Sequence, residues 1–239
     1  MGQAVAMPYA SGHLPSNAAT VCARDELRPG GNELTRRAID CAGFAAGADI
    51  LDLGCGSGVG SRLLRRHGCR VIALDHSHQA LTTATRRLAG LESIAADACR
   101  LPLSDASIGG ILAECSLSLA GYASAALAEC LRVLRPGGRL AITDVYARDP
   151  SPSPAPESAG CPGHLAGRDA ILAALARTGL RIERWEDHSA LLKRFIAQLI
   201  MNCGSTDSLW GGNPELGEKL RQQRPGYFLL IAAKAAGRN

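Results

Sequence analysis

A glycine-rich turn between two apolar strands is the sequence feature that most constrains this fold. Residues 50–58 read Ile-Leu-Asp-Leu-Gly-Cys-Gly-Ser-Gly, and residues 71–75 read Val-Ile-Ala-Leu-Asp. A strand, a glycine-rich turn, a helix and a second strand together form the βαβ unit of nucleotide-binding folds. Glycine lets the backbone turn tightly and approach a ligand. Asp75, at the end of the second strand, could accept hydrogen bonds from both hydroxyls of a ribose.

The spacing of the glycines argues against a dinucleotide. The dinucleotide fingerprint is G-x-G-x-x-G, but Val59 and Ser61 stand where its third glycine would fall in the two frames. Asp52, just before the turn, would repel a pyrophosphate, and no Gly-Lys-Ser/Thr follows as in a P-loop. A carboxylate there suits a ligand that carries an ammonium and a sulfonium. The remaining candidate is S-adenosylmethionine, and a nicotinamide-dependent dehydrogenase is the disfavoured alternative.

Four segments resemble the class I S-adenosylmethionine-dependent methyltransferases, over residues 32–185. They are the glycine-rich turn, Asp75, the run 96–102 and the run 131–140. The resemblance is nearest to the arsenite and ubiquinone types of small-molecule methyltransferase. It implies one acid for the ribose, another for the adenine, and a residue after the fourth strand that faces the methyl group. The residues that it assigns to the cofactor are Asp52, Gly54, Cys55, Gly56, Gly58, Asp75, His76, Asp97, Ala98 and Glu114.

Apolar stretches alternate with helical ones along the rest of the chain. The pattern predicts strands over 50–54, 70–75, 92–95, 109–114, 139–146, 180–187 and 226–234, and helices over 32–43, 58–67, 78–88, 122–134 and 168–178. This alternation is typical of an α/β fold, a doubly wound Rossmann-like sheet of seven strands with helices on both faces. The resemblance makes the last strand antiparallel. Because ligands of such sheets bind beyond the carboxyl ends of the strands, Asp52, Asp75, Asp97 and Glu114 should converge on one edge.

Three regions lie outside this core pattern. Residues 1–31 predict an N-terminal arm, and residues 32–239 predict a methyltransferase domain whose first helix is capped by Asn32. The proline-alternating run 149–157 is either a lid or a solvated connector. Residues 189–225 begin with apolar side chains at helical spacing, which predicts an inserted helix that ends at Cys203. That insertion is an extra helix on the sheet, a substrate cap or a dimer surface.

Length and composition favour one soluble domain. The chain has 239 residues, 46% of them hydrophobic, without an apolar run long enough for a membrane span or an N-terminal signal peptide, so we expect a cytoplasmic protein. The 26 basic and 22 acidic residues are well mixed, which does not favour nucleic acid as a partner. Nine cysteines without C-x-x-C spacing do not indicate a metal site. We expect Cys55, Cys69, Cys115 and Cys130 in the core.

The residues that act on the methyl acceptor are harder to identify, because methyl transfer mainly needs its reactants positioned and desolvated. Glu114 either contacts the cofactor or substrate or caps the next helix. His164 and His188 are candidate bases near the substrate edge. We therefore predict methyl transfer from S-adenosylmethionine to an unidentified small molecule. A protein that binds this cofactor without transferring the methyl group is the alternative from another functional class.

A second resemblance concerns metalloids. Residues 142–148, with Cys161 downstream, are similar to a segment of arsenite methyltransferases in which a loop cysteine binds trivalent arsenic. The resemblance makes Cys161 the candidate catalytic residue. Cys41 and Cys203 stand where further thiolates would be needed, since a soft metalloid takes two or three of them. Arsenite methylation is therefore the alternative acceptor chemistry.

Overall fold

The computed structural model describes residues 28–118, 124–150, 165–203 and 214–237. The elements in chain order are α2 (Gly31–Ala42), β1 (Asp49–Leu53), α3 (Val59–Arg66), β2 (Arg70–Asp75), α4 (His78–Arg87), β3 (Glu92–Ala95), β4 (Ile108–Glu114), α5 (Ser124–Val133), β5 (Leu134–Ala147), α6 (Arg168–Thr178), β6 (Arg181–Asp187), α7 (Ser189–Cys203), α8 (Pro214–Gln222) and β7 (Pro225–Ala233). Elements β2, β3 and α6 begin and end where the sequence predicts.

The strands form one seven-stranded sheet in the order β3-β2-β1-β4-β5-β7-β6. Strands β1 to β5 pair in parallel, whereas β7 is antiparallel to both β5 and β6. The predicted doubly wound α/β sheet with an antiparallel last strand is therefore confirmed. The strand order reverses between β1 and β4, which are neighbours in the sheet. Ligands of open α/β sheets bind at this switch point, beyond the carboxyl ends of the strands.

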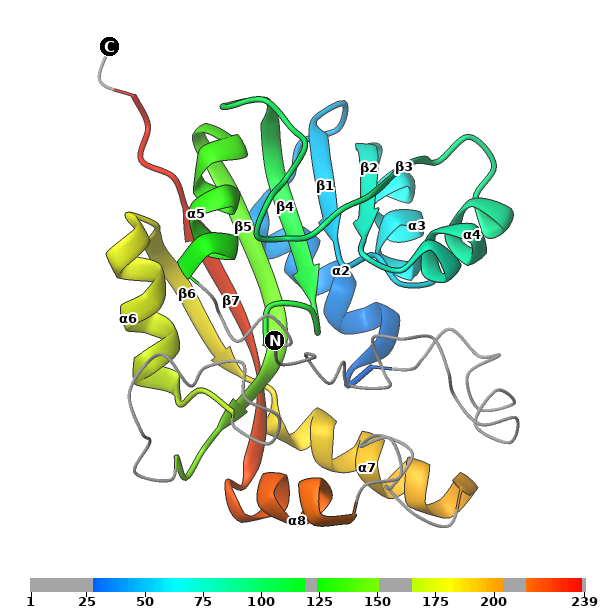
Figure 1. Cartoon of the computed structure of the whole chain (residues 1–239), viewed down its shortest axis with the longest axis vertical. Helices are drawn as coiled ribbons and strands as arrows, with labels where there is room; N and C mark the ends of the chain where they lie inside the picture. The colour runs from blue at the N-terminus through cyan, green and yellow to red at the C-terminus, as the bar shows by residue number, and fades with distance from the viewer. Residues whose placement is uncertain (1–27, 119–123, 151–164, 204–213, 238–239) are drawn as a thin grey trace, which may run out of the picture.

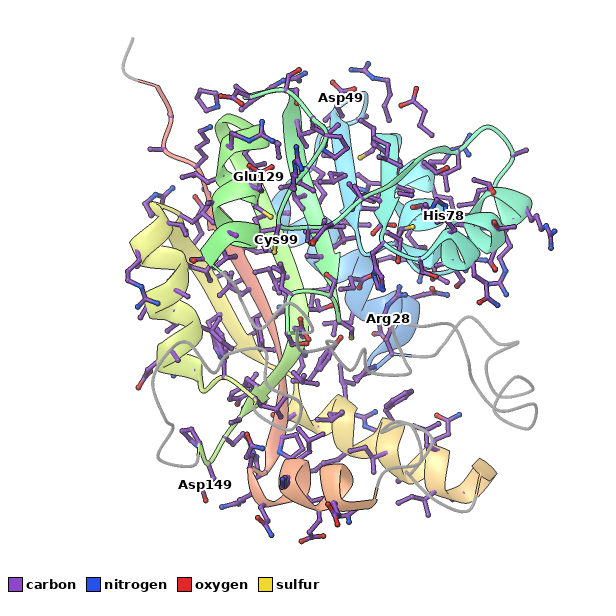
Figure 2. All side chains as sticks on the ribbon, viewed as in Figure 1. Arg28, Asp49, His78, Cys99, Glu129 and Asp149 are labelled. Atoms are coloured by element: carbon purple, nitrogen blue, oxygen red, sulfur yellow. The ribbon has the colours of Figure 1, made fainter. Side chains whose placement is uncertain are left out.

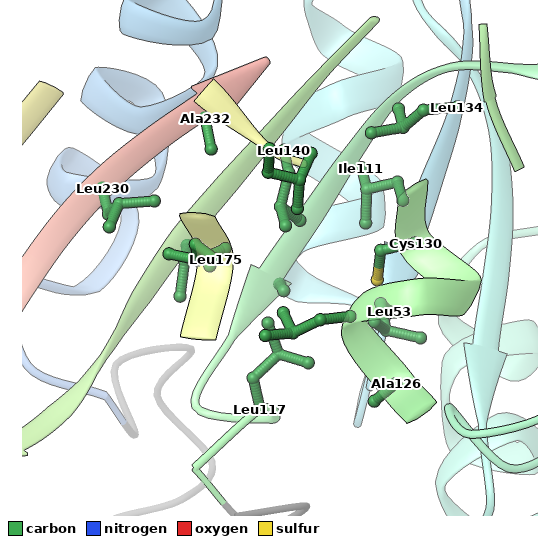
Figure 3. Close-up of a cluster of buried hydrophobic side chains, with 14 of the residues drawn as sticks. Leu53, Ile111, Leu117, Ala126, Cys130, Leu134, Leu140, Leu175, Leu230 and Ala232 are labelled. Carbon is green, nitrogen blue, oxygen red and sulfur yellow. The ribbon is translucent and has the colours of Figure 1, made fainter. Parts of the chain in front are cut away.

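Helices cover both faces of the sheet (Figure 1). One buried cluster joins the sheet to α5 and α6 through side chains such as Leu127, Cys130 and Leu175; Figure 3 shows part of this layer. A second cluster joins the other face to α2, α3 and α4. Helices α7 and α8 lie beyond the end of the sheet to which the β4 and β5 arrows point (Figure 1). The carboxyl edge is thus flanked by the inserted residues.

The start of the first described helix corrects one prediction. Asn32 is not the N-cap, because α2 begins at Gly31 and its N-cap is Gly30, at φ 80° and without a side-chain hydrogen bond. A Cβ on Gly30 would lie 2.6 Å from Cβ of Leu34 and 2.9 Å from Cδ1 of Leu191 in α7. Close packing of the turn against α2 and α7, together with positive φ, requires glycine here.

Strand β5 is longer than the predicted 139–146. Its first residue already pairs with β4, because Leu134 is the partner of Ile108 before a register shift leads to the Gly110–Arg139 pair. The Pro-Gly-Gly turn that follows α5 is therefore part of β5 and does not precede it.

The insertion is helical, as its first half predicts. Helix α7 ends at Cys203 as expected, but α8 is not predicted by the sequence pattern. Most of the run 149–157 and most of the predicted N-terminal arm lie outside the described residues. Among the helices that are described, none is long and apolar enough to span a bilayer.

Candidate cofactor site

The turn between β1 and α3 is built by three glycines in left-handed conformations. The φ angles are 74° at Gly54, 53° at Gly56 and 83° at Gly58. The N–H of Gly54 donates to the Leu74 carbonyl at 2.7 Å, which ties the turn to β2. A Cβ on Gly54 would lie 2.6 Å from Cβ of Ser116, whereas one on Gly56 would meet nothing within 4 Å. The turn is therefore packed at its first glycine and open at its second.

Asp75 closes the turn from the neighbouring strand. One carboxylate oxygen accepts the Gly56 N–H at 2.9 Å, and the other accepts the Ser77 N–H at 2.9 Å. The residue is only 7% exposed. Because each carboxylate oxygen can accept two hydrogen bonds, both keep accepting capacity for a ligand above the turn.

Asp52 lies at the end of β1 against the first turn of α3. Its carboxylate accepts a hydrogen bond from the Ser61 hydroxyl at 2.6 Å, and a Cβ on Gly60 would lie 3.1 Å from both of its oxygens. A negative charge thus occupies the helix N-terminus, which in dinucleotide-binding folds holds a pyrophosphate. Burial raises the pKa of this carboxyl to about 7, against the opposing effect of the Ser61 hydrogen bond.

Glu114, at the end of β4, is the centre of an ion-pair network with Arg28. Arg28 Nη2 lies 3.3 Å from Glu114 Oε2, and these side chains are 14% and 8% exposed. The Thr35 hydroxyl of α2 donates to Glu114 Oε1 at 2.8 Å, and the Arg28 guanidinium also hydrogen-bonds Thr35. Glu114 therefore pairs with Arg28 and with Thr35 of α2. Arg28 lies where the chain enters α2 (Figure 2).

Asp52, Glu114 and Arg28 together form a charged cluster, which we call the acid pair with its arginine. A Cβ added to Gly60 would lie 3.1 Å from the Asp52 oxygens and also 3.3 Å from Glu114 Oε2. The two carboxylates therefore face the same point. Glu114 further raises the pKa of Asp52, and Arg28 lowers it. Two acids and one cation in a largely buried place are complementary to a ligand that carries both an ammonium and a carboxylate.

The residues assigned to the adenine lie after β3 and β2. Asp97 is exposed, and its Oδ1 accepts the backbone N–H of Cys99 at 2.8 Å. Ala98 packs against the core cluster on the α5 side. His76 is largely exposed, with Nδ1 3.5 Å from an Asp75 oxygen. A backbone hydrogen bond also ties the segment after β3 to β2, because the Ala96 N–H donates to the Asp75 carbonyl at 3.2 Å.

Two cysteine thiols of the site have raised pKa values. Burial raises the pKa of the Cys55 thiol far above its ordinary value and that of Cys115 to about 12. Cys115 has φ 50°, which is rare outside glycine. Its Sγ lies 2.9 Å from the hydroxyl of Tyr227, which donates to Thr143 at 3.4 Å. The expected core positions hold for Cys55, Cys69 and Cys130, whereas Cys115 is half-buried at the sheet edge.

The loop that follows Cys115 is anchored by a buried acid of β5. Asp144 is fully buried, and its carboxylate accepts the Ser118 N–H at 2.9 Å and the Ser118 hydroxyl at 2.6 Å. It also accepts the N–H of Val145 at 2.8 Å. Burial raises its pKa to about 6.

Sequence reasoning missed Arg28, Thr35 and Asp144. Thr35 lies in the buried stripe of α2, whose other members are Leu34, Ala38, Ile39 and Ala42. A polar residue in an apolar stripe, and an acid inside an apolar strand as at Asp144, need a buried partner. These two positions are therefore signals of a buried polar contact that the sequence itself contains. Arg28 carried no such signal, because it stands in an irregular segment before the helix.

Of the predicted acceptor-side residues Cys161, His164 and His188, the structure describes only His188. Cys161 and His164 lie outside the described residues. His188 is partly buried, with Nε2 3.0 Å from Glu186, a carboxylate that also accepts a hydrogen bond from Arg37. Across the described ranges, no group of three or more His, Cys, Asp or Glu side chains could hold a metal ion.

Comparison with known proteins places the chain among methyltransferases. Residues 51–142 match the family model of the methyltransferase domain. An O-methyltransferase of Pyrenophora dematioidea is 30% identical over 211 residues, which are 79% of this chain and 75% of that protein. A demethylmenaquinone methyltransferase of Beutenbergia cavernae is 38% identical over 121 residues, and a malonyl-acyl-carrier-protein O-methyltransferase of Enterobacter lignolyticus 39% over 120. The chain spans about half the length of these two relatives, 50% and 48%. The arsenite alternative gains no support from them.

Solved structures agree on the fold. The cyclase SpnF superposes with a TM-score of 0.67 at 25% identity, over 85% of this chain and 81% of that one. A geranyl diphosphate methyltransferase in complex with SAM superposes with a TM-score of 0.69 at 20% identity, over 84% of each chain. The second likeness shows the shared fold alone.

Proposed function

This chain belongs to the class I S-adenosylmethionine-dependent methyltransferases, and we propose that it transfers the methyl group of S-adenosylmethionine to a small-molecule acceptor. The observation that carries the proposal is the convergence of Asp52, Asp75 and Glu114 around an open glycine turn at the switch point of the sheet. Three carboxylates suit a ligand with a cationic end and a ribose diol. They do not suit one with phosphates.

The residues fit the cofactor along the length of the turn. A Cβ on Gly56 would project into open space, as a backbone cradle for a ligand requires. In the proposal the acid pair with its arginine holds the amino-acid end, Asp52 and Glu114 toward the ammonium and Arg28 toward the carboxylate. Asp75 accepts the ribose hydroxyls. Asp97, Ala98 and His76 border the adenine.

The bound cofactor supplies an electrophilic methyl group on a sulfonium, and the chain's residues orient it and exclude water. The left-handed glycines, Gly58 included, let the backbone approach the ligand. The thiols of Cys55 and Cys115, whose pKa values burial raises, keep the surroundings of low polarity. Such a site works mainly by positioning and desolvation.

The acceptor class rests on relatives with different substrates. The names of two relatives refer to demethylmenaquinone and to malonyl-acyl-carrier protein. We propose an organic small molecule as the acceptor for this chain, bound beside helices α7 and α8, and Cys161 as an acceptor-side residue. Formation of S-adenosylhomocysteine with a panel of quinol and carboxylate acceptors tests this class. That the protein forms a homodimer and that it is located in the cytoplasm both remain predictions.

The first experiment is a calorimetric titration with S-adenosylhomocysteine. Asp75→Ala is expected to weaken binding by about 10- to 100-fold, because the ribose would lose hydrogen bonds to a charged acceptor worth about 1.5–3 kcal/mol. Asp49→Ala is the matched control: it removes an acid of β1 that pairs with Arg70 and Arg135 at the other end of the sheet (Figure 2). Equal affinities of the wild type and Asp75→Ala would reject the ribose role.

A second candidate function is binding of the cofactor without methyl transfer. The observation that favours it is the likeness to SpnF, whose name is that of a cyclase. Binding of S-adenosylhomocysteine in the same titration, together with no S-adenosylhomocysteine formed from S-adenosylmethionine on any acceptor, would support this alternative. No binding at all would reject both functions.

A further inference from the structure

The segment after β4 places a serine directly on the glycine turn. Ser116 follows Glu114 and Cys115, and its Cβ lies 2.6 Å from the position that a Cβ on Gly54 would take. Its Oγ lies 3.4 Å from that same position. Because β1 and β4 are neighbours in the sheet, Ser116 stands on the β4 side of the turn, across the switch point.

The backbone on both sides of Ser116 is held in place. The Cys115 N–H donates to the Thr143 carbonyl at 2.8 Å, and its Sγ contacts the Tyr227 hydroxyl. On the other side, Leu117 is only 1% exposed and Ser118 is fixed by the Asp144 carboxylate. Ser116 therefore cannot easily shift to find a new hydrogen-bond partner.

The hydroxyl of Ser116 nevertheless lacks a partner within the described part of the chain. Its Oγ is a buried atom with no hydrogen bond. Most buried polar groups are paired, and one that is not calls for an explanation, such as a missing ligand. The neighbouring serine shows the contrast, since Ser118 makes two hydrogen bonds to Asp144.

We propose that Ser116 is a cofactor-positioning residue whose hydroxyl binds the amino-acid end of S-adenosylmethionine. This inference rests on the proposed function. The side chain packs on the first glycine of the turn, and Ser116 follows Glu114, a member of the acid pair with its arginine, by two residues in the chain. A hydroxyl can donate to a carboxylate or accept from an ammonium, so it complements either group of an α-amino acid.

The test compares two probes on Ser116→Ala. S-adenosylhomocysteine carries the amino-acid end, whereas 5′-methylthioadenosine lacks it. The variant is expected to bind S-adenosylhomocysteine about tenfold more weakly and 5′-methylthioadenosine as the wild type does. Its melting temperature without ligand should be unchanged or higher, because the hydroxyl that is removed has no partner. A structural hydroxyl would give the opposite, a lower melting temperature.

Each outcome separates this inference from the proposed function. If the wild type binds S-adenosylhomocysteine and Ser116→Ala binds it equally well, Ser116 has no role while the proposed function stands. Equal weakening of both probes would also overturn the inference, because the effect would not depend on the amino-acid end. A wild type that binds neither probe would overturn the proposed function, and the role of Ser116 with it. Ser118→Ala, which frees the Asp144 carboxylate, is the control for a structural loss in the same loop.

Discussion

Asp52→Asn is expected to raise the melting temperature of the unliganded protein at pH 8 by about 5–10 °C, although it changes the proposed cofactor site. Asp52 is 3% exposed, and burial raises the pKa of its carboxyl to about 7. Above that pH the folded chain must hold a buried charge. An amide of nearly the same shape has no charge and can still accept the hydrogen bond from Ser61.

The direction of the pKa shift sets the pH dependence. The folded-state value of about 7 lies above the ordinary value of 3.8, so the folded protein binds this proton more tightly than the unfolded chain. The stabilisation that this proton gives the folded state is complete below pH 3.8 and is lost as the pH rises toward 7. The free energy of unfolding falls by roughly 4 kcal/mol at most over this range. Thermal melts of wild type and variant should therefore diverge from about pH 5 to pH 8. Coinciding melts at pH 8 would contradict a destabilising charge at Asp52.

Asp144→Asn is the matched control, and a smaller effect is expected. Asp144 is also buried with a raised pKa, but its carboxylate accepts hydrogen bonds from Ser118 and Val145. An amide would turn its NH₂ toward one of these donors and leave a buried N–H unpaired. That loss costs about 1–3 kcal/mol and offsets what removing the buried charge gains, so this variant should melt close to the wild type.

The same Asp52→Asn variant should lose cofactor affinity. In the proposed site the ionised carboxylate faces an ammonium, so removing its charge should weaken S-adenosylhomocysteine binding at pH 8 by about tenfold or more. Wild-type affinity should fall from about pH 8 to pH 6 as Asp52 takes up a proton. The variant should lack this part of the pH dependence. A residue that is unfavourable for folding is then retained for binding, as is common at functional sites.

Local sequence signals predict the part of the site whose geometry comes from one chain segment. The turn at 54–58 and Asp75 belong to one βαβ unit, in which strand, turn and helix follow each other in the chain. Their positions are therefore readable from spacing alone. The bounds of β2 and the start of α4 follow in the same way, since Asp75 ends the strand and Ser77 caps the helix through the Ala80 N–H.

The rest of the site depends on contacts between distant segments. Arg28 and Thr35 meet Glu114, 79 positions beyond Thr35 in the chain, and nothing local to either segment encodes that pairing. Likewise Gly30 serves as N-cap in place of Asn32 because α7, from the late insertion, packs against the turn. The long β5 depends on its partner strands. Such features need the assembled sheet.

Gly54→Ala and Gly56→Ala should separate the fold of the turn from its ligand space. Both positions have positive φ, which costs an alanine about 1 kcal/mol. At Gly54 the new methyl would also lie 2.6 Å from Cβ of Ser116. Since the backbone around Ser116 is held on both sides, the overlap adds about 1–3 kcal/mol. Gly54→Ala is therefore expected to lower the melting temperature by about 5–15 °C without any ligand.

At Gly56 the new methyl would meet nothing within 4 Å. Gly56→Ala should therefore fold with only the small loss that its φ causes, yet bind S-adenosylhomocysteine at least about tenfold more weakly, because the methyl enters the space proposed for the ligand. Melting curves and titrations of both variants check the contrast. If Gly56→Ala binds the ligand like the wild type, the cofactor does not cross the turn at its second glycine. The proposed alignment of the acid pair at one end and Asp75 at the other would then have to be replaced by a path on the β4 side of the turn.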